Sequence, residues 1–577
     1  MDKKLEKLRH STSHVLAQAV MRLYEGVKVG MGPAVKNGFY YDFEFPEKIK
    51  ISKEDLDKIS GEMHKIINRG HNFKQEYISK EKALKIFKDQ PYKMELIKQF
   101  ADSDQEKLSI YKSSEFVDLC RGPHLDSTSE IYAFKLTEVA GAYWKGNEKN
   151  KMLTRIYGTA FSTKKKLKKH LKQLEKARQR DHRKLGKKLK LFSIHSQEAG
   201  PGLIHWHPRG ERVKKIIENF WDDVHFKNNY KLVSTPHIAS EELYKISGHL
   251  QNYEDMMYSA MDIDGKPYRA KPMNCPGHIM IYNSDVHSYR ELPIKYAEMG
   301  TVYRYEKSGV LHGLMRVRGF TIDDAHIICS KNNLEKEVLE VINFCFDFLK
   351  SFKFEEFSIY LSTKPEDKFV GSDEDWEKAE GSLKKALEKK GIDYDIDPGG
   401  GAFYGPKIDI KVEDSLGREW QCSTIQFDFN IPKRFDMSYD GPKKEERPYM
   451  IHRALLGSVE RFLGVLIEHY GGRFPLWLAP VQVEILPIDE SHLEFCQNLK
   501  DKFIKENIRV EINSKDENLG KKIWQSRKMF TPYMLIVGDQ EIEKKELSVR
   551  KLSKGDIGKF SVEIFLNLLK KEINQKK

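Results

Sequence analysis

The sequence predicts an α+β protein made of several domains. At 577 residues the chain is too long to fold around a single hydrophobic core. Strand-like runs and helical patterns both occur along the chain, and 39% of its residues are hydrophobic, as in proteins with a well-buried interior. No run of 18 apolar residues occurs, so the sequence predicts no membrane span.

The N-terminal part, residues 1–161, is expected to form an α+β domain of its own. It mixes helical patterns with strand-like runs such as Gly38–Phe43. Its first residues lead into an amphipathic pattern and not into the apolar core of a signal peptide.

Residues 162–190 are expected to form a basic linker helix. Between residues 164 and 190 there are 14 Lys and Arg residues but only two acidic ones, so this segment holds +12 of the net charge of +13. Leu167, Leu171 and Leu174 recur at helical spacing, which predicts packing along one edge. A charge run is often only a solvated helix face, but this density also suits a polyanion such as a nucleic acid.

The rest of the chain divides near residue 475. Residues 191–475 hold many strand candidates. After them, short buried-strand runs at 481–486, 508–512 and 533–537 alternate with helical stretches, which predicts a small α/β domain over residues 476–577. The six cysteines are scattered without a Cys-x-x-Cys pair, so we expect reduced thiols and a cytoplasmic protein.

One segment, residues 303–326, carries more chemistry than any other. It sets three arginines, the adjacent carboxylates Asp323 and Asp324, and His326 around a glycine-bearing turn. Its flanks, residues 294–302 and 319–322, are typical of two strands joined by a long loop. Arginine forks match the paired oxygens of phosphates and carboxylates. The sequence therefore predicts a hairpin that carries an anion site.

This hairpin resembles motif 2 of the class II aminoacyl-tRNA synthetases, and most closely that of the threonyl enzymes. Residues 234–250 look like motif 1, a dimer-interface element in this class. Residues 271–278 are similar to a threonyl-enzyme signature, and residues 452–462 look like motif 3, a strand that runs into a helix. The motifs occur in family order, and the resemblance covers essentially the whole chain.

The resemblance implies a fold and an activity. The catalytic domain, residues 191–475, would be an antiparallel sheet flanked by helices, and the chain would form a homodimer through it. An editing domain would precede it and an anticodon-binding domain would follow it. The implied activity is ATP-dependent formation of threonyl-adenylate from L-threonine, transfer to tRNA(Thr), and hydrolytic editing of Ser-tRNA(Thr). Bacterial relatives often begin with a small ubiquitin-like domain, whereas this chain starts at the editing helix.

The activation step joins two anions, so the protein must neutralise them and hold them in line. By resemblance, Arg304 bridges the α-phosphate of ATP and the substrate carboxylate. Arg461 reaches the γ-phosphate of a bent ATP, and Arg316, expected on the returning strand, joins the phosphate contacts. Mg²⁺ would bridge phosphate oxygens.

Three further residues, Cys275, His326 and His452, are implicated only by the resemblance. They lie 51 and 126 residues apart, and this spacing alone is more typical of a buried thiol and two hydrogen-bonded histidines. In the threonyl enzymes these positions bind Zn²⁺, which implies one zinc ion per subunit. A thiolate and two imidazoles leave one tetrahedral position open, as in catalytic zinc sites. Threonine would take it through its amino and hydroxyl groups.

The amino-acid pocket follows from the same resemblance. Asp324 would accept the proton of the substrate hydroxyl. Tyr404, Lys407 and Gln421 match family positions that line the pocket. Ile322 departs from the family, in which we expect glutamine, so one polar pocket contact is open to question.

A second, hydrolytic site is expected because serine lacks only one methyl group of threonine. A missing methyl is worth roughly 1–3 kcal/mol, which is too little discrimination for translation. His10 and His14 stand at i, i+4, about opposite the apolar stripe of their helix, which counts against core histidines. Cys120 and His124 form a second such pair. The resemblance to the editing domain of threonyl and alanyl enzymes adds Lys93, Tyr111 and Asp118.

Two questions stay open at this point. The Cys and His residues of the editing domain could bind zinc, as in alanyl-type domains, although we favour metal-free editing by water and an imidazole base. The chain could also be a regulatory or RNA-binding relative without catalysis, or a class II enzyme for proline or serine. Loss of catalysis would show as a broken motif arginine or zinc ligand, and none is broken. The Cys275, His326 and His452 set argues against proline and serine.

Overall fold

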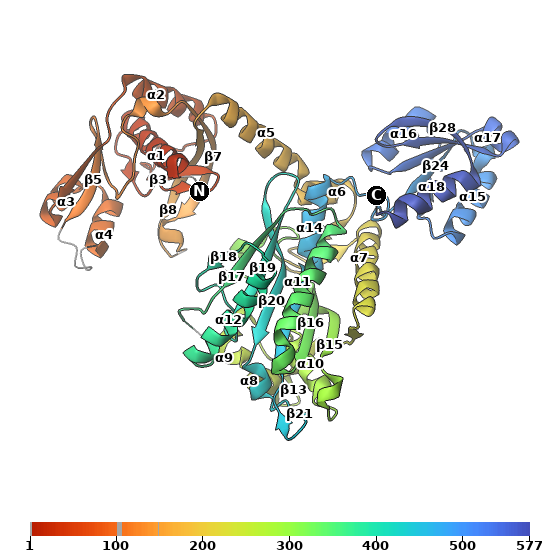
Figure 1. Cartoon of the computed structure of the whole chain (residues 1–577). Coiled ribbons are helices and arrows are strands. Elements are labelled where there is room, and N and C mark those ends of the chain that lie inside the picture. Colours follow the sequence, from red (N-terminus) through yellow and green to blue (C-terminus); the bar gives the residue numbers. More distant parts are fainter. Residues whose placement is uncertain (1–2, 101–106, 148, 368, 577) are drawn as a thin grey trace. The chain divides into compact units, whose positions relative to one another are not determined.

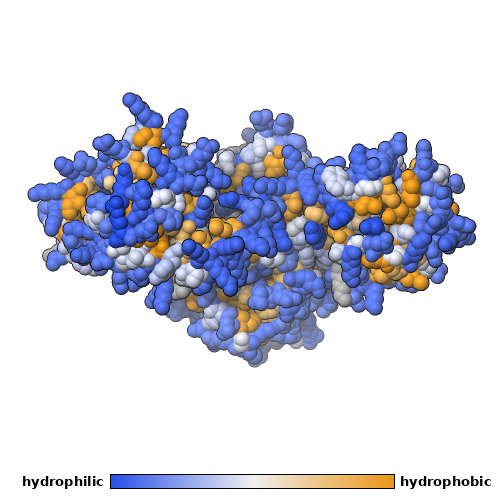
Figure 2. Space-filling view, turned by 90° about the horizontal axis from the view of Figure 1, so that it is seen from above, coloured by the Kyte–Doolittle hydropathy of each residue, from blue (hydrophilic) through white to orange (hydrophobic). Residues whose placement is uncertain are grey.

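The computed structural model describes residues 3–100, 107–147, 149–367 and 369–576. They fall into two compact units, Met1–Glu175 and Lys176–Lys577, shown in Figure 1. Within the described ranges, no helix is both long and apolar enough to cross a membrane. Hydrophilic side chains cover most of the face shown in Figure 2, and hydrophobic ones form small groups between them.

The first unit is built around a long buried helix, α1 (Lys3–Leu23), which packs on an antiparallel sheet and on α2 (Asp55–Arg69). The strands pair in the order β1–β3–β8–β7, with β2 on β3. Their bounds are β1 Lys28–Val29, β2 Ala34–Val35, β3 Gly38–Glu44, β7 Ala133–Tyr143 and β8 Met152–Phe161.

A smaller subdomain lies within the same unit. Its strands pair antiparallel in the order β4–β5–β6. Its elements are β4 Lys74–Ile78, α3 Lys80–Ile86, α4 Pro91–Phe100, β5 Leu108–Ser113 and β6 Phe116–Leu119. Because α1 is enclosed from several sides, it is buried almost continuously from Leu8 to Val20. His14 is therefore only 3% exposed, and the expectation that it lies opposite the buried side of its helix was wrong.

The basic linker contains two helices, α5 (Lys164–Arg180) and α6 (His182–Lys188), where the sequence predicted one. The break lies at Asp181, whose side chain caps α6 by accepting a hydrogen bond from the backbone N–H of Arg183. None of the described side chains of α5 is buried, and its three leucines are only partly covered. The predicted packing of this helix along one edge is therefore weak.

The second unit holds a large sheet with strand order β11–β15–β16–β23–β20–β19–β17–β18. It is antiparallel as predicted, except at the two ends, where β11 and β18 pair parallel to their neighbours. Helices α11, α12 and α14 pack on it over a shared hydrophobic core. The strands are β11 Lys231–Leu232, β15 Ile294–Tyr303, β16 Gly319–Cys329, β17 Phe357–Ser362, β18 Asp395–Asp397, β19 Lys407–Glu413, β20 Glu419–Asp428 and β23 Tyr449–Ser458.

Helices and short ribbons surround this sheet. The helices are α7 Pro208–Lys227, α8 Glu241–Ser247, α9 His249–Tyr253, α10 Cys275–Tyr282, α11 Leu334–Lys350, α12 Asp373–Lys389, α13 Ile431–Arg434 and α14 Val459–Tyr470. The ribbons are β9 Phe192–Ile194 with β10 Ile204–Trp206, β12 Ile238–Ser240 with β14 Lys266–Ala270 and β13 Met261–Ile263, and β21 Tyr439–Asp440 with β22 Glu445–Glu446.

The predicted hairpin and strand-to-helix elements are both present. Strands β15 and β16 pair antiparallel from Ile294 opposite Ile328 to Tyr303 opposite Gly319. Strand β23 runs directly into α14. One detail differs from the expectation: Arg316 lies in the loop before β16 and not on the returning strand.

The C-terminal part of the second unit is an α/β layer with its own core, as the sequence predicted. Strands β25, β24 and β26 are parallel, and β27 and β28 continue the sheet antiparallel. The elements are β24 Val483–Pro487, α15 Leu493–Lys505, β25 Val510–Ile512, α16 Leu519–Lys528, β26 Tyr533–Val537, α17 Asp539–Lys544, β27 Glu546–Lys551, β28 Gly555–Ser561 and α18 Val562–Asn574.

Candidate active site

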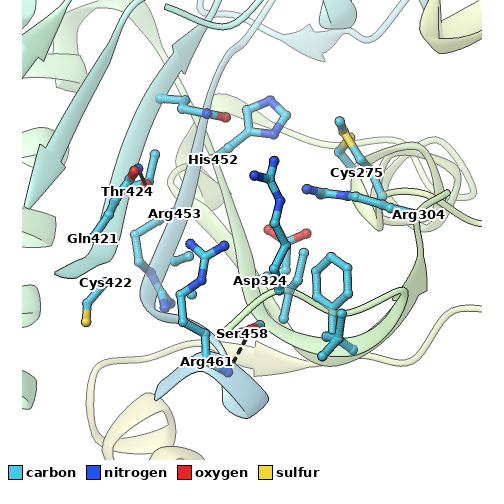
Figure 3. A pocket seen from close by; sticks show the side chains of 18 of the residues that line it. Cys275, Arg304, Asp324, Gln421, Cys422, Thr424, His452, Arg453, Ser458 and Arg461 are labelled. Carbon is cyan, nitrogen blue, oxygen red and sulfur yellow. Dashed lines mark hydrogen bonds between the residues drawn. The ribbon is translucent and has the colours of Figure 1, made fainter. Parts of the chain in front are cut away.

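A cleft of about 250 Å³ lies over the large sheet, between strands β16, β20 and β23, the loop that follows β15, and the start of α14. Figure 3 shows side chains from these elements converging on it. The sequence-predicted residues that line this cleft are Cys275, Arg304, Arg316, Ile322, Asp324, Tyr404, Gln421, His452 and Arg461.

At one end of the cleft Cys275, His326 and His452 come together. Cys275 begins α10, and the two histidines are register partners on β16 and β23. One ligand atom from each lies within 4.8 Å of the others, and all three residues are buried. Residues that are 51 and 126 positions apart in sequence thus form a single donor set of one thiol and two imidazoles, which suits zinc.

Neighbouring side chains fix the orientation of both imidazoles. Nε2 of His452 lies 2.8 Å from Oδ2 of Asp428. A carboxylate can only accept, so the ring proton is on Nε2 and the bare Nδ1 faces Nε2 of His326 at 3.0 Å. Nδ1 of His326 lies 2.8 Å from Nδ1 of His278, whose Nε2 lies 3.1 Å from Oε2 of Glu298. Metal-binding histidines typically have such partners behind them.

The protonation of this cluster fits a cation. Burial raises the pKa of the Cys275 thiol well above its usual value and lowers the pKa of His326 well below its own. His326 is therefore neutral and can offer a lone pair, as can the Nδ1 that Asp428 leaves bare on His452, and a bound dication would supply the charge that favours the thiolate. The residues present fit a zinc ion.

Beside the cluster is a small polar pocket. Asp324 accepts a hydrogen bond of 3.2 Å from Nδ2 of Asn274, and burial raises its pKa. The Tyr404 ring lies 4.9 Å from that of His452, and its hydroxyl donates to Oε1 of Gln426 at 2.5 Å. Gln426 also lines the cleft, although the sequence did not single it out.

Two predicted pocket residues, Lys407 and Gln421, meet at Asp409. Nε2 of Gln421 donates to Oδ1 of Asp409 at 2.6 Å, and Nζ of Lys407 pairs with Oδ2 at 2.8 Å. Lys407 and Asp409 are not among the residues that line the cleft, so Lys407 is linked to it through Asp409 and Gln421. Ile322 does line the cleft, where it presents an aliphatic surface.

The predicted arginines bring positive charge to the other part of the cleft, where Nε of Arg316 donates to Oε2 of Glu306 at 3.1 Å. Nε of Arg304 donates to the carbonyl of Pro272 at 3.1 Å, and Nε of Arg461 donates to the carbonyl of Met315 at 3.1 Å. Burial, together with nearby Arg316 and Arg304, lowers the pKa of Arg461. Because the guanidinium groups repel one another, the cleft favours a ligand with several negative charges.

The first unit contains a second pocket, of about 590 Å³. His10, His14 and Cys120 line it, and together with the adjacent His124 they place one ligand atom each within 4.8 Å of the others. Sγ of Cys120 lies 3.3 Å from Nε2 of His10 and 3.2 Å from Nε2 of His124. Burial and the nearby Asp118 raise the pKa of the thiol to about 12. The two i, i+4 pairs predicted from sequence therefore form one cluster.

Asp118 connects this cluster to further residues. It pairs with Lys93, accepts a 2.6 Å hydrogen bond from the Tyr41 hydroxyl, and has Oδ2 3.4 Å from Nε2 of His14. Burial, with smaller effects of His10 and Lys93, lowers the pKa of His14 well below its usual value. Tyr41 was not singled out from sequence, where it is one aromatic residue of a buried strand.

Tyr111 lies just behind the pocket lining, with its ring 4.4 Å from that of His124. Its hydroxyl is packed so closely on Gly122 that a Cβ there would lie 2.3 Å from it. Gly122 also has φ +73°, which side chains disfavour. All seven editing residues predicted from sequence thus lie in or against one pocket.

Three segments match described families. Residues 108–157 match the "Threonyl and Alanyl tRNA synthetase second additional domain". Residues 258–470 match the "tRNA synthetase class II core domain (G, H, P, S and T)". Residues 482–572 match the "Anticodon binding domain". The three matches follow the order that the motifs predicted.

Similar proteins extend over nearly the whole chain. A threonine–tRNA ligase of Sulfurihydrogenibium is 52% identical over 99% of this chain and 89% of its own length. That of Borreliella afzelii is 51% identical over 99% and 98%. The structure titled as the RNA binding domain of threonyl-tRNA synthetase from Cryptosporidium parvum is 38% identical, covers 68% of this chain and 98% of its own, and has a TM-score of 0.66.

A putative threonyl-tRNA synthetase structure from Aeropyrum pernix has a TM-score of 0.60 and 33% identity, over 69% of this chain and 96% of its own. With half of its residues shared with curated relatives along their length, and with both predicted clusters assembled, the chain belongs to the threonine–tRNA ligases, which are class II aminoacyl-tRNA synthetases.

Proposed function

We propose that separate parts of this ligase carry out the activation of threonine and its transfer to tRNA, the hydrolysis of mischarged Ser-tRNA, and the binding of the anticodon. Residues 1–161 are assigned to editing, 162–190 to the linker, 191–475 to catalysis and 476–577 to anticodon binding. The observation that carries the catalytic assignment is one cleft that brings three arginines together with a Cys/His/His set.

In the activation step an oxygen of the threonine carboxylate attacks the α-phosphorus of ATP. The bond from that phosphorus to the bridging oxygen breaks, and pyrophosphate leaves with the oxygen and the electron pair of the bond. Arg304 stands between the two ends of the cleft and neutralises both the attacking carboxylate and the α-phosphate. Arg461 and Arg316 hold the outer phosphates, and Mg²⁺ bound together with ATP would neutralise further phosphate charge. In the free enzyme the positive charges of Arg316 and Arg304 repel Arg461. The phosphates of ATP would offset this repulsion, which supports the assignment.

Selection of the amino acid rests on the other end of the cleft. We assign Cys275, His326 and His452 as ligands of one zinc ion per subunit. Zinc held there would act as a Lewis acid that accepts lone pairs from the amino and hydroxyl groups of threonine. Asp324 accepts the hydroxyl proton, while Tyr404 and Gln426 close the pocket beside His452. Valine has no hydroxyl group, so it donates nothing to Asp324 and covers part of this carboxylate without replacing its contact with water.

For the editing pocket we propose hydrolysis without a metal. His14 and His124 act on a water molecule near the ester of Ser-tRNA, and Lys93 and Asp118 fix the floor. The Lys93 ammonium, paired with Asp118 beside the cluster, would repel a second cation there, which supports a metal-free site.

We also propose that the chain is a cytoplasmic homodimer. Large apolar side chains are exposed in the motif 1 segment and in the segments before and after it, among them Ile238 and Ile246 within the motif, Phe226 (78% exposed) before it and Val286 (84% exposed) after it. Exposed apolar side chains of this kind are typical of a protein interface when they form one patch. Sedimentation of the wild-type chain should give a dimer, and the Val286→Asp variant should shift it toward monomer.

Pyrophosphate exchange tests the activation site directly. With ATP and Mg²⁺, threonine should support clear exchange, serine some and valine almost none. Equal exchange with valine would refute the selection of the substrate hydroxyl group. Arg304→Ala should abolish exchange with every amino acid, because it removes a shared contact and not a selective one.

A further inference from the structure

A third buried cluster, away from both pockets, joins the linker to the ATP end of the cleft. Its centre is His182, the first residue of α6, whose side chain is fully buried. Nδ1 of His182 lies 2.6 Å from Oε1 of Glu468 on α14, and the same oxygen accepts the backbone N–H of His182 at 3.0 Å. Nε2 lies 3.0 Å from the backbone nitrogen of Leu314, in the loop between β15 and β16.

These partners determine the tautomer of His182. The backbone N–H of Leu314 can only donate, so Nε2 must be the bare nitrogen and Nδ1 must carry the proton that is donated to Glu468. Both ring nitrogens are thus committed to protein groups. The cluster is a hydrogen-bonded clamp between α6, α14 and the loop, although Asp181, His182 and Glu468 stand close enough to suggest a metal site.

The loop is shaped to accept this contact. Gly313 has φ +50°, and a Cβ on it would lie 2.1 Å from Nε2 of His182, so only glycine allows the approach. The next residue, Leu314, is fully buried. On α14, a Cβ on Gly464 would meet Cβ of Leu314 at 3.2 Å. The loop is therefore pressed between α6 and α14 at this point.

Met315, which follows Leu314, orients Arg461, one of the arginines assigned to ATP. The carbonyl of Met315 accepts the hydrogen bond from Nε of Arg461, and Arg316 comes next in the chain. From His182 to Arg461 there are only two hydrogen bonds and one intervening peptide segment. We propose that His182 is a positioning residue for ATP: it fixes the loop at Leu314, and so the Met315 carbonyl that orients Arg461.

This inference rests on the proposed assignment of Arg461 and Arg316 to the phosphates of ATP. It goes beyond that assignment because His182 touches neither substrate and lies in the segment that leads from the first unit into the second. Its predicted effect is specific: loss of the Leu314 contact should weaken ATP and leave threonine selection, at the other end of the cleft, unchanged.

Two amide variants separate the two hydrogen bonds. In His182→Asn the amide nitrogen can replace Nδ1 and keep Glu468, but the side chain is too short to reach Leu314. In His182→Gln the amide oxygen can replace Nε2 and accept from Leu314. Pyrophosphate exchange should show the KM for ATP raised about tenfold in His182→Asn, with the KM for threonine within about twofold of wild type. His182→Gln should restore most of the ATP affinity.

Lys184→Ala, on the exposed side of α6, is the matched control and should behave as wild type. Arg461→Ala in the same assay distinguishes the assignment of Arg461 to ATP from the positioning role of His182. If Arg461→Ala leaves the KM for ATP unchanged, the ATP assignment itself fails. If Arg461→Ala weakens ATP while His182→Asn does not, only the role of His182 is overturned. A parallel rise of both KM values, or no recovery in His182→Gln, would also overturn it, since a merely structural role predicts those results.

Discussion

His452 and Asp428 form a 2.8 Å hydrogen bond that decides which nitrogen of the histidine faces Cys275 and His326, the other two proposed zinc ligands. The carboxylate holds the proton on Nε2 and leaves Nδ1 free. Removing its charge should make the imidazole a poorer ligand, even when the contact survives.

The first prediction concerns this pair. Asp428→Asn should lower zinc affinity about 10-fold, within the range of about 10- to 100-fold known for such partners. Competition with a chromogenic chelator measures the effect. Asp440→Asn, on the exposed end of β21, is the control and should bind zinc as wild type does. Equal affinities in all three proteins would mean that Asp428 does not tune the site.

The second prediction counts metal ions. Elemental analysis of the purified chain should find one zinc per subunit. Cys275→Ala should lose it together with threonine-dependent exchange, because two imidazoles alone hold zinc weakly. Cys120→Ala should keep it. Two zinc ions in the wild type, with one lost in Cys120→Ala, would contradict metal-free editing.

The third prediction separates the two activities. His14→Ala should slow hydrolysis of Ser-tRNA(Thr) by about 10²- to 10⁴-fold, the usual contribution of a positioned acid–base group, and leave threonine charging intact. Ser-tRNA would then accumulate. His64→Ala replaces an exposed histidine of α2 and serves as control. Normal clearance of Ser-tRNA by the His14 variant would remove that residue from the editing mechanism.

The fourth prediction is the pH dependence of editing. An ordinary histidine loses its basic form below about pH 6.5. Burial lowers the pKa of His10, His14 and His124, so the imidazoles stay neutral and able to take a proton at lower pH. The single-turnover rate of Ser-tRNA hydrolysis should therefore be constant from pH 8 to pH 6. A decline of the rate near pH 6.5 would show that the active histidine has a normal pKa.

The ordered motifs allowed the fold and both clusters to be predicted from sequence. The hydrophobic pattern predicted the hairpin strands and the C-terminal α/β layer, because burial of one face gives the sequence of a helix or strand a characteristic spacing of apolar residues. Cys275, His326 and His452 were different: nothing in their spacing pointed to a metal, and only the resemblance did. What joins the two histidines is the register of β16 and β23, which no local pattern encodes.

The residues that sequence reasoning missed share a physical reason. Asp428, His278, Tyr41 and Gln426 act through partners that lie on other elements, so their roles exist only after folding. The wrong expectation about His14 has a similar origin. A helix that is enclosed on several sides buries polar residues together with apolar ones. A helical wheel that is based on a single apolar stripe cannot predict that the opposite face is also covered.

The lack of buried side chains on α5 means that this helix depends on its own sequence for stability. Lysines four apart, such as Lys164 with Lys168 and Lys168 with Lys172, repel one another, and each such pair costs about 0.2–0.5 kcal/mol. Counterions reduce that repulsion, and so do the phosphates of a bound RNA. Added salt should therefore stabilise helix α5, which connects the two units, while it weakens the binding of tRNA. Bound tRNA should itself stabilise this helix.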